Sequence, residues 1–316
     1  MIGAYNLTVA FGAAQALRDV SFEVHPGDRI GVVGESGCGK TMLGLAMIGM
    51  TPDAAKVSGS LLLNGTEVVG ASENSWQDQR ARRVAMVFQE PMAALNPIKR
   101  IGDSVMEPLM VHFGLSRKQA RKRALALFEE VAIPDPEARL KQFPHEVSGG
   151  QRQRVLIALA LSCDPELLIA DEPTTALDAN VALRITDLLA RLARDRTMAL
   201  LFISHDLAAV ARATQDMLVI YGGDIVERGS TADVLSQPKH PYTQGLLAAR
   251  PSPWNVREIG GRRKRLPTIP GSVPSLANLP TGCRFAGRCP FEISRCAAQK
   301  PVEREGTICH LPEAER

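Results

Sequence analysis

A glycine-rich loop ending in lysine and threonine is the strongest chemical signal in the sequence. It reads Gly34-Glu-Ser-Gly-Cys-Gly-Lys-Thr41, between a predicted strand at residues 29–33 and a predicted helix at residues 41–50. Glycines let backbone N–H groups turn inward around phosphate oxygens, and the helix directs its positive end at the same anion. In this pattern Lys40 reaches the β- and γ-phosphates of a nucleotide, and the Thr41 hydroxyl binds Mg²⁺. The other loop residues expected around the phosphates are Gly34, Ser36, Gly37, Cys38 and Gly39, of which Cys38 fills a position open to any small side chain.

Two adjacent carboxylates, Asp171 and Glu172, follow the apolar run at residues 167–170. Carboxylates at the end of a buried strand are costly to desolvate unless they meet a cation or a polar partner. In a protein with a phosphate loop, Asp171 is placed to hold Mg²⁺ and Glu172 to polarise the attacking water as a general base. The alternative is a pair of carboxylates neutralised by neighbouring basic groups.

The motif that separates this chain from other phosphate-loop proteins is Ser148-Gly-Gly-Gln-Arg152. It resembles the signature of the ABC ATPases, with Val147 where that family usually has leucine. Further matches follow in the family's order: Gln89 after a predicted strand, Ala176-Leu-Asp178 after the acid pair, and Ser204-His-Asp206 after the next strand. Together these motifs cover about residues 1–230.

The resemblance implies roles for residues that would be unremarkable alone. Ser148, Gly149, Gly150 and Gln151 begin a helix and form a second anion site, which acts on the ATP held by a partner cassette in a head-to-tail dimer. Asp178 belongs to the same composite site. Gln89 contacts the Mg²⁺ and the reaction centre, and His205 contacts the γ-phosphate and positions the attacking water. Phe11 is where the family stacks an aromatic ring on adenine, with a core role for Phe11, or Tyr5 in its place, as the alternatives.

Three segments resemble one branch of the family, the oligopeptide and dipeptide importer ATPases: residues 88–97, Pro144-His-Glu146 and His240-Pro-Tyr-Thr243. The resemblance implies two transmembrane permeases, a second and different ATP-binding subunit, and an extracytoplasmic binding protein. It places the chain at the cytoplasmic face of the inner membrane, held there by the permeases. A nickel or other-solute importer ATPase, and a soluble ABC ATPase that does not transport, are the alternatives.

The elements that must position these residues alternate between strand and helix, which predicts a largely parallel sheet covered on both faces. We therefore expect an α/β fold, and the resemblance implies that it is the P-loop NTPase fold of ABC type, with an antiparallel β subdomain near the N-terminus. A helical subdomain is expected at about residues 92–162, within a nucleotide-binding domain at residues 1–250. Residues 251–316, rich in Pro, Gly, Arg and Cys, are predicted to be a linker and a separate small cysteine-rich module.

Four of the six cysteines, Cys283, Cys289, Cys296 and Cys309, fall in the last part of the chain, which has too few large apolar residues for a core of its own. Four thiolates could bind Zn²⁺ or an iron–sulfur cluster, or remain free. The importer resemblance implies a [4Fe–4S] cluster.

Composition argues against nucleic acid as a partner. The net charge of the 316 residues is only +3, and the basic run at residues 262–265 lacks stacking aromatics. We interpret that run as solvated linker charge.

Overall fold

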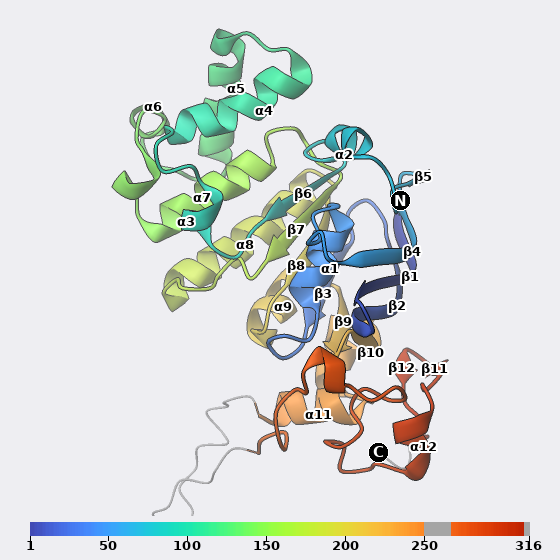
Figure 1. The fold of residues 1–316 in the computed structure, drawn as a ribbon. Coiled ribbons are helices and arrows are strands. Elements are labelled where there is room, and N and C mark those ends of the chain that lie inside the picture. The colour runs from blue at the N-terminus through green and yellow to red at the C-terminus, as the bar shows by residue number, and fades with distance from the viewer. Residues whose placement is uncertain (250–266, 313–316) are drawn as a thin grey trace, which may run out of the picture.

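The computed structural model describes residues 1–249 and 267–312, whose helices and strands are arranged as in Figure 1. The α/β class predicted from the alternation of strands and helices is confirmed. The basic run at residues 262–265 lies outside the described residues. Among the described helices, none is both long and apolar enough to cross a lipid bilayer.

The larger sheet carries the phosphate loop and the acid pair. Its strands are β3 (Arg29–Val33), β6 (Val84–Val87), β7 (Leu167–Asp171), β8 (Ala199–Ile203), β9 (Asp216–Tyr221), β10 (Asp224–Ser230), β11 (Glu303–Arg304) and β12 (Thr307–Ile308). They lie in the order β11-β12-β10-β9-β3-β8-β7-β6. The strands from β9 to β6 are parallel, and the other three pair antiparallel. Every residue of β7 and β8 is buried, as expected for central strands covered on both faces.

A smaller antiparallel sheet forms the predicted β subdomain. Its strands are β1 (Ile2–Phe11), β2 (Ala14–Val24), β4 (Lys56–Leu63) and β5 (Thr66–Glu67), in the order β2-β1-β4-β5. A hairpin turn joins β4 to β5 through Asn64 and Gly65, whose φ angles are +50° and +79°. Positive φ at both central residues is what a tight hairpin turn requires.

Helices cover the sheets, and the helices that lie between β6 and β7 in the sequence form a separate layer. Those packed around the sheets are α1 (Lys40–Met47), α2 (Glu73–Gln79), α8 (Ala179–Asp195), α9 (Leu207–Ala213), α10 (Thr231–Ser236) and α11 (Pro241–Ala248). The helical layer comprises α3 (Pro91–Ala94), α4 (Ile101–Phe113), α5 (Arg117–Glu130), α6 (Pro136–Arg139), the 3-10 turn η1 (Pro144–Glu146) and α7 (Gly149–Ala160).

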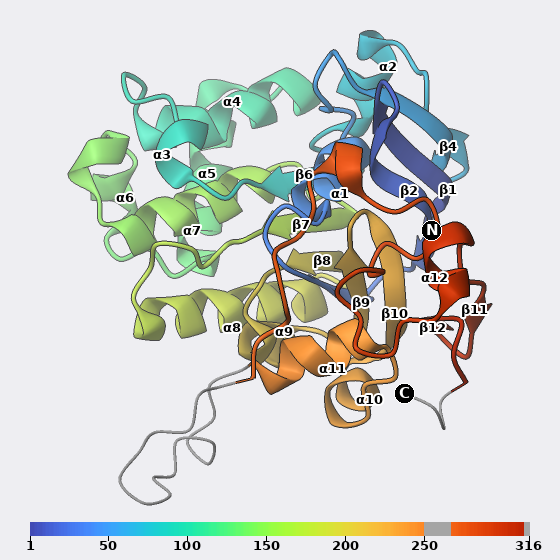
Figure 2. The same cartoon turned by 60° about the horizontal axis from the view of Figure 1, so that its bottom comes forward.

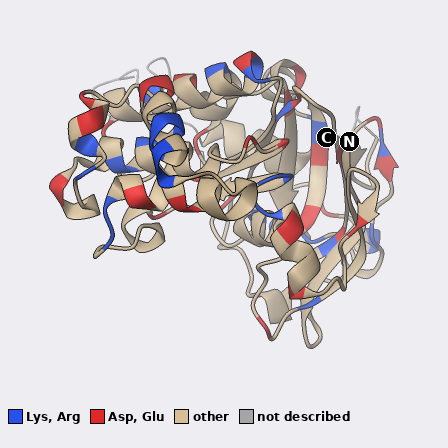
Figure 3. Ribbon diagram, turned by 90° about the horizontal axis from the view of Figure 1, so that it is seen from above, with Lys and Arg blue, Asp and Glu red and all other residues tan. Residues whose placement is uncertain are grey.

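The basic helix α5 begins at a capping box, in which the Ser116 hydroxyl accepts the Gln119 N–H at 3.4 Å. Its arginines pair with carboxylates of neighbouring elements, as Arg117 does with Asp103 at 2.6 Å. Figure 3 shows basic residues concentrated along one helix on the left of the view, with acidic residues on the elements around it. The charge of α5 is therefore largely balanced locally.

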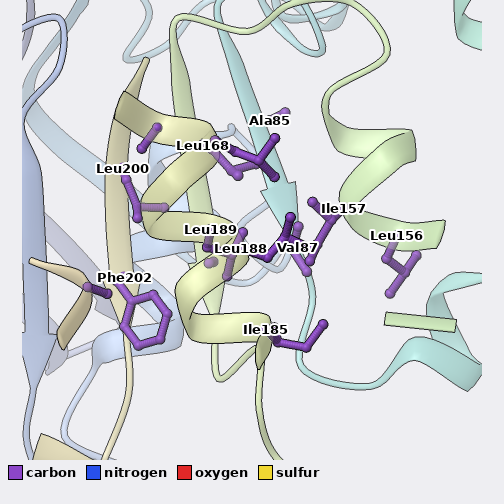
Figure 4. Close-up of a cluster of buried hydrophobic side chains, with 14 of the residues drawn as sticks. Ala85, Val87, Leu156, Ile157, Leu168, Ile185, Leu188, Leu189, Leu200 and Phe202 are labelled. Carbon is purple, nitrogen blue, oxygen red and sulfur yellow. The ribbon is translucent and has the colours of Figure 1, made fainter. Parts of the chain in front are cut away.

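A buried apolar cluster joins the helical layer to the sheet. Figure 4 shows Val87, Leu168 and Phe202 of the sheet facing Ile157 of α7 and Leu189 of α8. All five side chains are fully buried or nearly so. Because this core is continuous, it fixes the start of α7, where the signature lies, relative to β7 and its acid pair.

The C-terminal segment at residues 267–312 packs against the cassette. It contains the 3-10 turn η2 (Leu276–Asn278), α12 (Ser294–Ala298), β11 and β12. Figure 2 shows this orange-red segment running from beside α11 to a short helix beside α1 and β2, and then to α12. Strand β12 pairs with β10 at Glu227 and Thr307, and the Arg228 N–H donates to the Gly306 carbonyl at 2.7 Å. The segment thus extends the larger sheet.

Candidate nucleotide site

The phosphate loop turns sharply between β3 and α1, the context predicted from its sequence. Gly39, which precedes α1, has φ +106°, and a Cβ there would lie 2.6 Å from the Ala16 carbonyl oxygen. Only glycine fits this position, both for its backbone angle and for the close approach of β2. The Lys40 side chain is buried and its Nζ lies 2.8 Å from the Gly34 carbonyl and 3.0 Å from the Glu35 carbonyl. The ammonium is thereby held inside the curve of the loop.

A magnesium position is indicated beside Thr41 and Asp171. Asp171 is 1% exposed, and its Oδ1 has no hydrogen-bond partner among the described residues. Burial raises the pKa of the Asp171 carboxyl, and a hydrogen bond with Thr41 and the charge of Lys40 oppose that rise. A buried, unpartnered carboxylate oxygen next to a hydroxyl matches the oxygen ligands that Mg²⁺ takes. The residues present therefore fit the ion that the sequence implied.

Glu172 and His205 form a hydrogen-bonded pair. The imidazole Nδ1 lies 2.8 Å from Glu172 Oε2 and 2.9 Å from Oε1, and the His205 N–H donates to Oε1 at 3.1 Å. Because a carboxylate only accepts, Nδ1 carries a proton and Nε2 is the nitrogen left for a ligand. The Thr175 hydroxyl donates to Oε2 at 3.3 Å.

The backbone of Glu172 is left-handed, with φ +47°. This conformation costs about 1 kcal/mol or more in a residue other than glycine. The Glu172 N–H donates to the Ile203 carbonyl of β8 at 2.9 Å, which holds the strained turn in place. The carboxylate is therefore fixed from several sides.

These groups share one cavity of about 560 Å³. It is lined by Phe11, Ala16, Ser36, Gly37, Gly39, Lys40, Thr41, Met42, Gln89, Glu172, Thr175, His205 and Leu276. The polar lining residues come from the loop and from four further positions, Gln89, Glu172, Thr175 and His205. Phe11, Ala16 and Leu276 supply apolar surface of the kind that accepts a flat base.

Comparison with known proteins agrees with this geometry. A family model described as "ABC transporter" matches residues 17–175, about half of the chain, including the loop, the signature and the acid pair. This chain belongs to the ABC transporter family. It is therefore an ATP-binding, ATP-hydrolysing subunit of that family. A second model, described as "Oligopeptide/dipeptide transporter, C-terminal region", matches residues 226–296.

Relatives match this ABC ATPase along almost its whole length. The "Oligopeptide transport ATP-binding protein OppD" of Escherichia coli K12 is 40% identical over 307 residues, 96% of this chain and 89% of that protein. The "Probable D,D-dipeptide transport ATP-binding protein DdpD" of the same organism is 45% identical over 287 residues, 90% of this chain and 86% of that protein. A solved dimeric bacterial ABC transporter cassette is 26% identical, with a TM-score of 0.65 over 73% of this chain and 99% of that chain.

The signature lies outside the cavity of its own ABC cassette. The Ser148 hydroxyl caps α7 by accepting the Gln151 N–H at 3.3 Å, and the Gln151 side chain accepts the Ser148 N–H at 3.0 Å. Asp178 caps α8 by accepting the Val181 N–H at 3.0 Å. None of these three residues, nor Gly149 or Gly150, lines the cavity.

Three other predicted residues also lie outside the lining: Gly34, Cys38 and Asp171. Cys38 is 1% exposed, and burial raises the pKa of its thiol, so this cysteine is a packed side chain without chemistry. Four lining residues were not predicted: Ala16, Met42, Thr175 and Leu276. Thr175 and Met42 follow predicted motifs closely enough to have been included, whereas no pattern in the sequence signals Ala16 or Leu276.

The four C-terminal cysteines gather without forming an evident single-ion site. Cys283, Cys296 and Cys309 are buried, Cys289 is half-buried, and all four are free thiols. Burial raises the pKa of Cys283 to about 12 and that of Cys289 to about 11, and the neighbouring cysteines add to both shifts. Within residues 1–249 and 267–312, no three His, Cys, Asp or Glu side chains converge to hold a metal ion. The predicted metal site is therefore not supported by this arrangement.

Proposed function

We propose that this ABC ATPase powers a peptide importer. The observation that carries the proposal is the match of its C-terminal part to the oligopeptide and dipeptide transporter region, downstream of a cassette with its nucleotide-site motifs intact. The names of the relatives support the same cargo class. Both Glu172 and His205 line the cavity, which argues against a regulatory cassette without activity.

In this proposal each cavity residue has one task. Lys40 and the loop N–H groups bind the phosphates, and Phe11 supports the base. Thr41, Asp171 and Gln89 hold Mg²⁺, which neutralises phosphate charge when bound. Glu172 takes a proton from the attacking water, while its hydrogen bond orients His205 so that Nε2 faces the γ-phosphate.

The site is completed by a second cassette, we propose, through Ser148, Gly149, Gly150, Gln151 and Asp178. Their placement at the starts of α7 and α8, outside the cavity, supports this role. A helix N-terminus directed at a partner's γ-phosphate would link ATP binding to dimer closure. The second cassette is a different chain in the importer branch that this sequence resembles.

Docking on a permease is supported by the helical layer. Ile98 and Val111 are 85% and 73% exposed, and they line a groove together with Met110 and Phe143. Exposed apolar side chains of this size mark an interaction surface. We propose that two transmembrane permeases dock here, holding the chain at the cytoplasmic face of the inner membrane, and that a binding protein delivers the peptide outside.

The proposal predicts ATP-dependent peptide uptake by vesicles that contain this chain, its partner ATPase, the permeases and the binding protein. Radiolabelled di- and oligopeptides should accumulate, and Glu172→Gln in this chain should reduce the initial rate at least about tenfold because hydrolysis is lost at one site. Accumulation of Ni²⁺ in place of peptides would contradict the cargo. An ATPase activity that is the same with and without the two permeases would contradict a transport role and favour a soluble ABC ATPase.

We also propose that the four cysteines of the C-terminal segment, called the tail below, hold a [4Fe–4S] cluster. The resemblance to the importer branch and the gathering of the thiols support it. Each thiolate of such a cluster binds a different iron, so the four sulfurs need not converge on one point as they do around Zn²⁺. The role would be structural, because the segment has little apolar surface to bury.

Protein purified without air should contain about four irons and four acid-labile sulfides per chain, as four thiolate ligands imply. Cys283→Ser should remove the brown colour and make residues after 266 more sensitive to protease, whereas Cys163→Ser, at a buried cysteine of the cassette, should leave the iron content unchanged. One equivalent of zinc without sulfide would show that the cysteines hold a zinc ion and not a cluster. Neither metal nor sulfide would mean free thiols.

A further inference from the structure

Arg288 of the C-terminal segment reaches the phosphate loop. Its Nη1 lies 2.8 Å from Oε2 of Glu35, and its Nη2 lies 3.2 Å from Oε1. The Arg288 side chain is only 5% exposed and that of Glu35 28%. Two parallel N–H···O bonds fix the direction of the pair as well as its distance. The C-terminal segment therefore contacts the phosphate loop directly, although a linker separates the two in sequence.

Arg288 is itself held in one orientation. Its Nε donates to the Pro270 carbonyl at 2.7 Å, and its Nη1 donates to the Tyr221 hydroxyl at 3.1 Å. The guanidinium also lies over the Tyr221 ring, 5.6 Å from its centroid. With its hydrogen bonds shared among the tail, β9 and the loop, this arginine cannot leave Glu35 without losing several partners.

Because Arg288 fixes the position of Glu35, it also affects the phosphate-binding groups that Glu35 contacts. Its carbonyl accepts the Lys40 ammonium at 3.0 Å, and its N–H donates to the Tyr242 hydroxyl at 2.7 Å. Its carboxylate also sits in the loop expected to surround a highly negative triphosphate. Without a cation, that carboxylate would repel the ligand, so its neutralisation by Arg288 favours binding.

The C-terminal segment also contributes a residue to the lining of the cavity. Leu276 of η2 lines it together with Phe11 and Ala16. In Figure 2 the short helix of the orange-red segment lies beside α1 and β2, which carry the lining residues Lys40 and Ala16. Leu276 thus adds apolar surface on the side where Phe11 is expected to meet the base.

We propose that the C-terminal segment is a working part of the nucleotide site: Arg288 positions and neutralises Glu35 on the phosphate side, and Leu276 forms a wall on the base side. The inference rests on the nucleotide site assigned above. Arg288 acts through Glu35 and is a positioning residue, whereas Leu276 touches the ligand.

Titration calorimetry of the full chain with Mg-ATP and with inorganic tripolyphosphate separates the two contributions. Arg288→Gln should weaken both ligands about tenfold, since it exposes the triphosphate to an unpaired carboxylate. Leu276→Ala should weaken ATP about fivefold and leave tripolyphosphate unchanged, because tripolyphosphate has no base. Leu276 is half-buried in a short turn, so its variant tests the proposal even where Arg288→Gln does not fold.

Two variants decide whether Arg288 acts through charge. Adding Glu35→Gln to Arg288→Gln should recover most of the lost affinity, which a merely structural arginine would not show. Lys300→Gln is the matched control, because Lys300 ties the same segment to Asp19 of β2 at 2.7 Å without touching the loop. It should bind both ligands like the parent.

Parental binding by both Arg288→Gln and Leu276→Ala would overturn the proposal. Equal losses in Arg288→Gln and Lys300→Gln, with no recovery in the double variant, would also overturn it by showing that any loosening of the tail suffices. Failure of the underlying site looks different: Lys40→Ala would then bind ATP as tightly as the parent.

Discussion

Replacing Glu172 by glutamine should slow ATP hydrolysis at least about a hundredfold while ATP still binds, because the substitution removes the general base and keeps the size of the side chain. The structure adds a second reason. Glu172 accepts hydrogen bonds from the His205 N–H, the His205 imidazole and the Thr175 hydroxyl. A carboxamide has one oxygen and would turn an N–H₂ group toward one of these donors, which disturbs the orientation of His205 as well.

The measurement is single-turnover hydrolysis in the assembled transporter, beside ATP binding by filter retention. Glu166→Gln is the matched control, since Glu166 lies just before β7, the strand that leads to Glu172, and pairs with Arg83 at the surface. Its rate should equal the parental rate. Near-parental hydrolysis by Glu172→Gln would assign the base to another residue.

Lys40→Ala should lose tight ATP binding, by at least about a hundredfold in dissociation constant, because a buried cation aimed at the phosphates is removed. The ammonium is held by the carbonyls of Gly34 and Glu35, so it is already in place when the nucleotide arrives. Such preorganisation reduces the entropy lost on binding.

Calorimetry with Mg-ATP measures this loss, with thermal unfolding as a check that the variant folds. Lys56→Ala serves as the matched lysine, because Lys56 is exposed at the start of β4 and away from the cavity. Parental affinity in Lys40→Ala would remove the phosphate-binding role from the loop.

Local patterns predicted most of the polar residues that the structure brings to one cavity. The spacing of glycine, lysine and threonine in the loop and the acid pair after an apolar strand each depend on neighbours in sequence. For such features the chain's own chemistry decides the geometry. The placement of Glu172 beside His205 needed only the further rule that parallel strands end at one edge of the sheet.

The tail could not be predicted in this way. Arg288 and Glu35 are 253 residues apart, and nothing in either sequence context signals the other. The composition beyond Pro251 predicts a linker, but a change in composition does not determine where the following segment docks. Strands of two residues, such as β11 and β12, also fall below what alternation can reveal.

The hairpin of β11 and β12 has a consequence for solubility. In the larger sheet, β10 would otherwise be an edge strand with unpaired backbone groups, and its pairing with β12 covers part of that edge. Edges of this kind recruit strands from other molecules unless they are blocked. The outer strand that replaces it is only two residues long and carries Glu303 and Arg304, both exposed and charged. Besides contacting the phosphate loop, the C-terminal segment is therefore expected to limit aggregation of the cassette through the edge of its larger sheet.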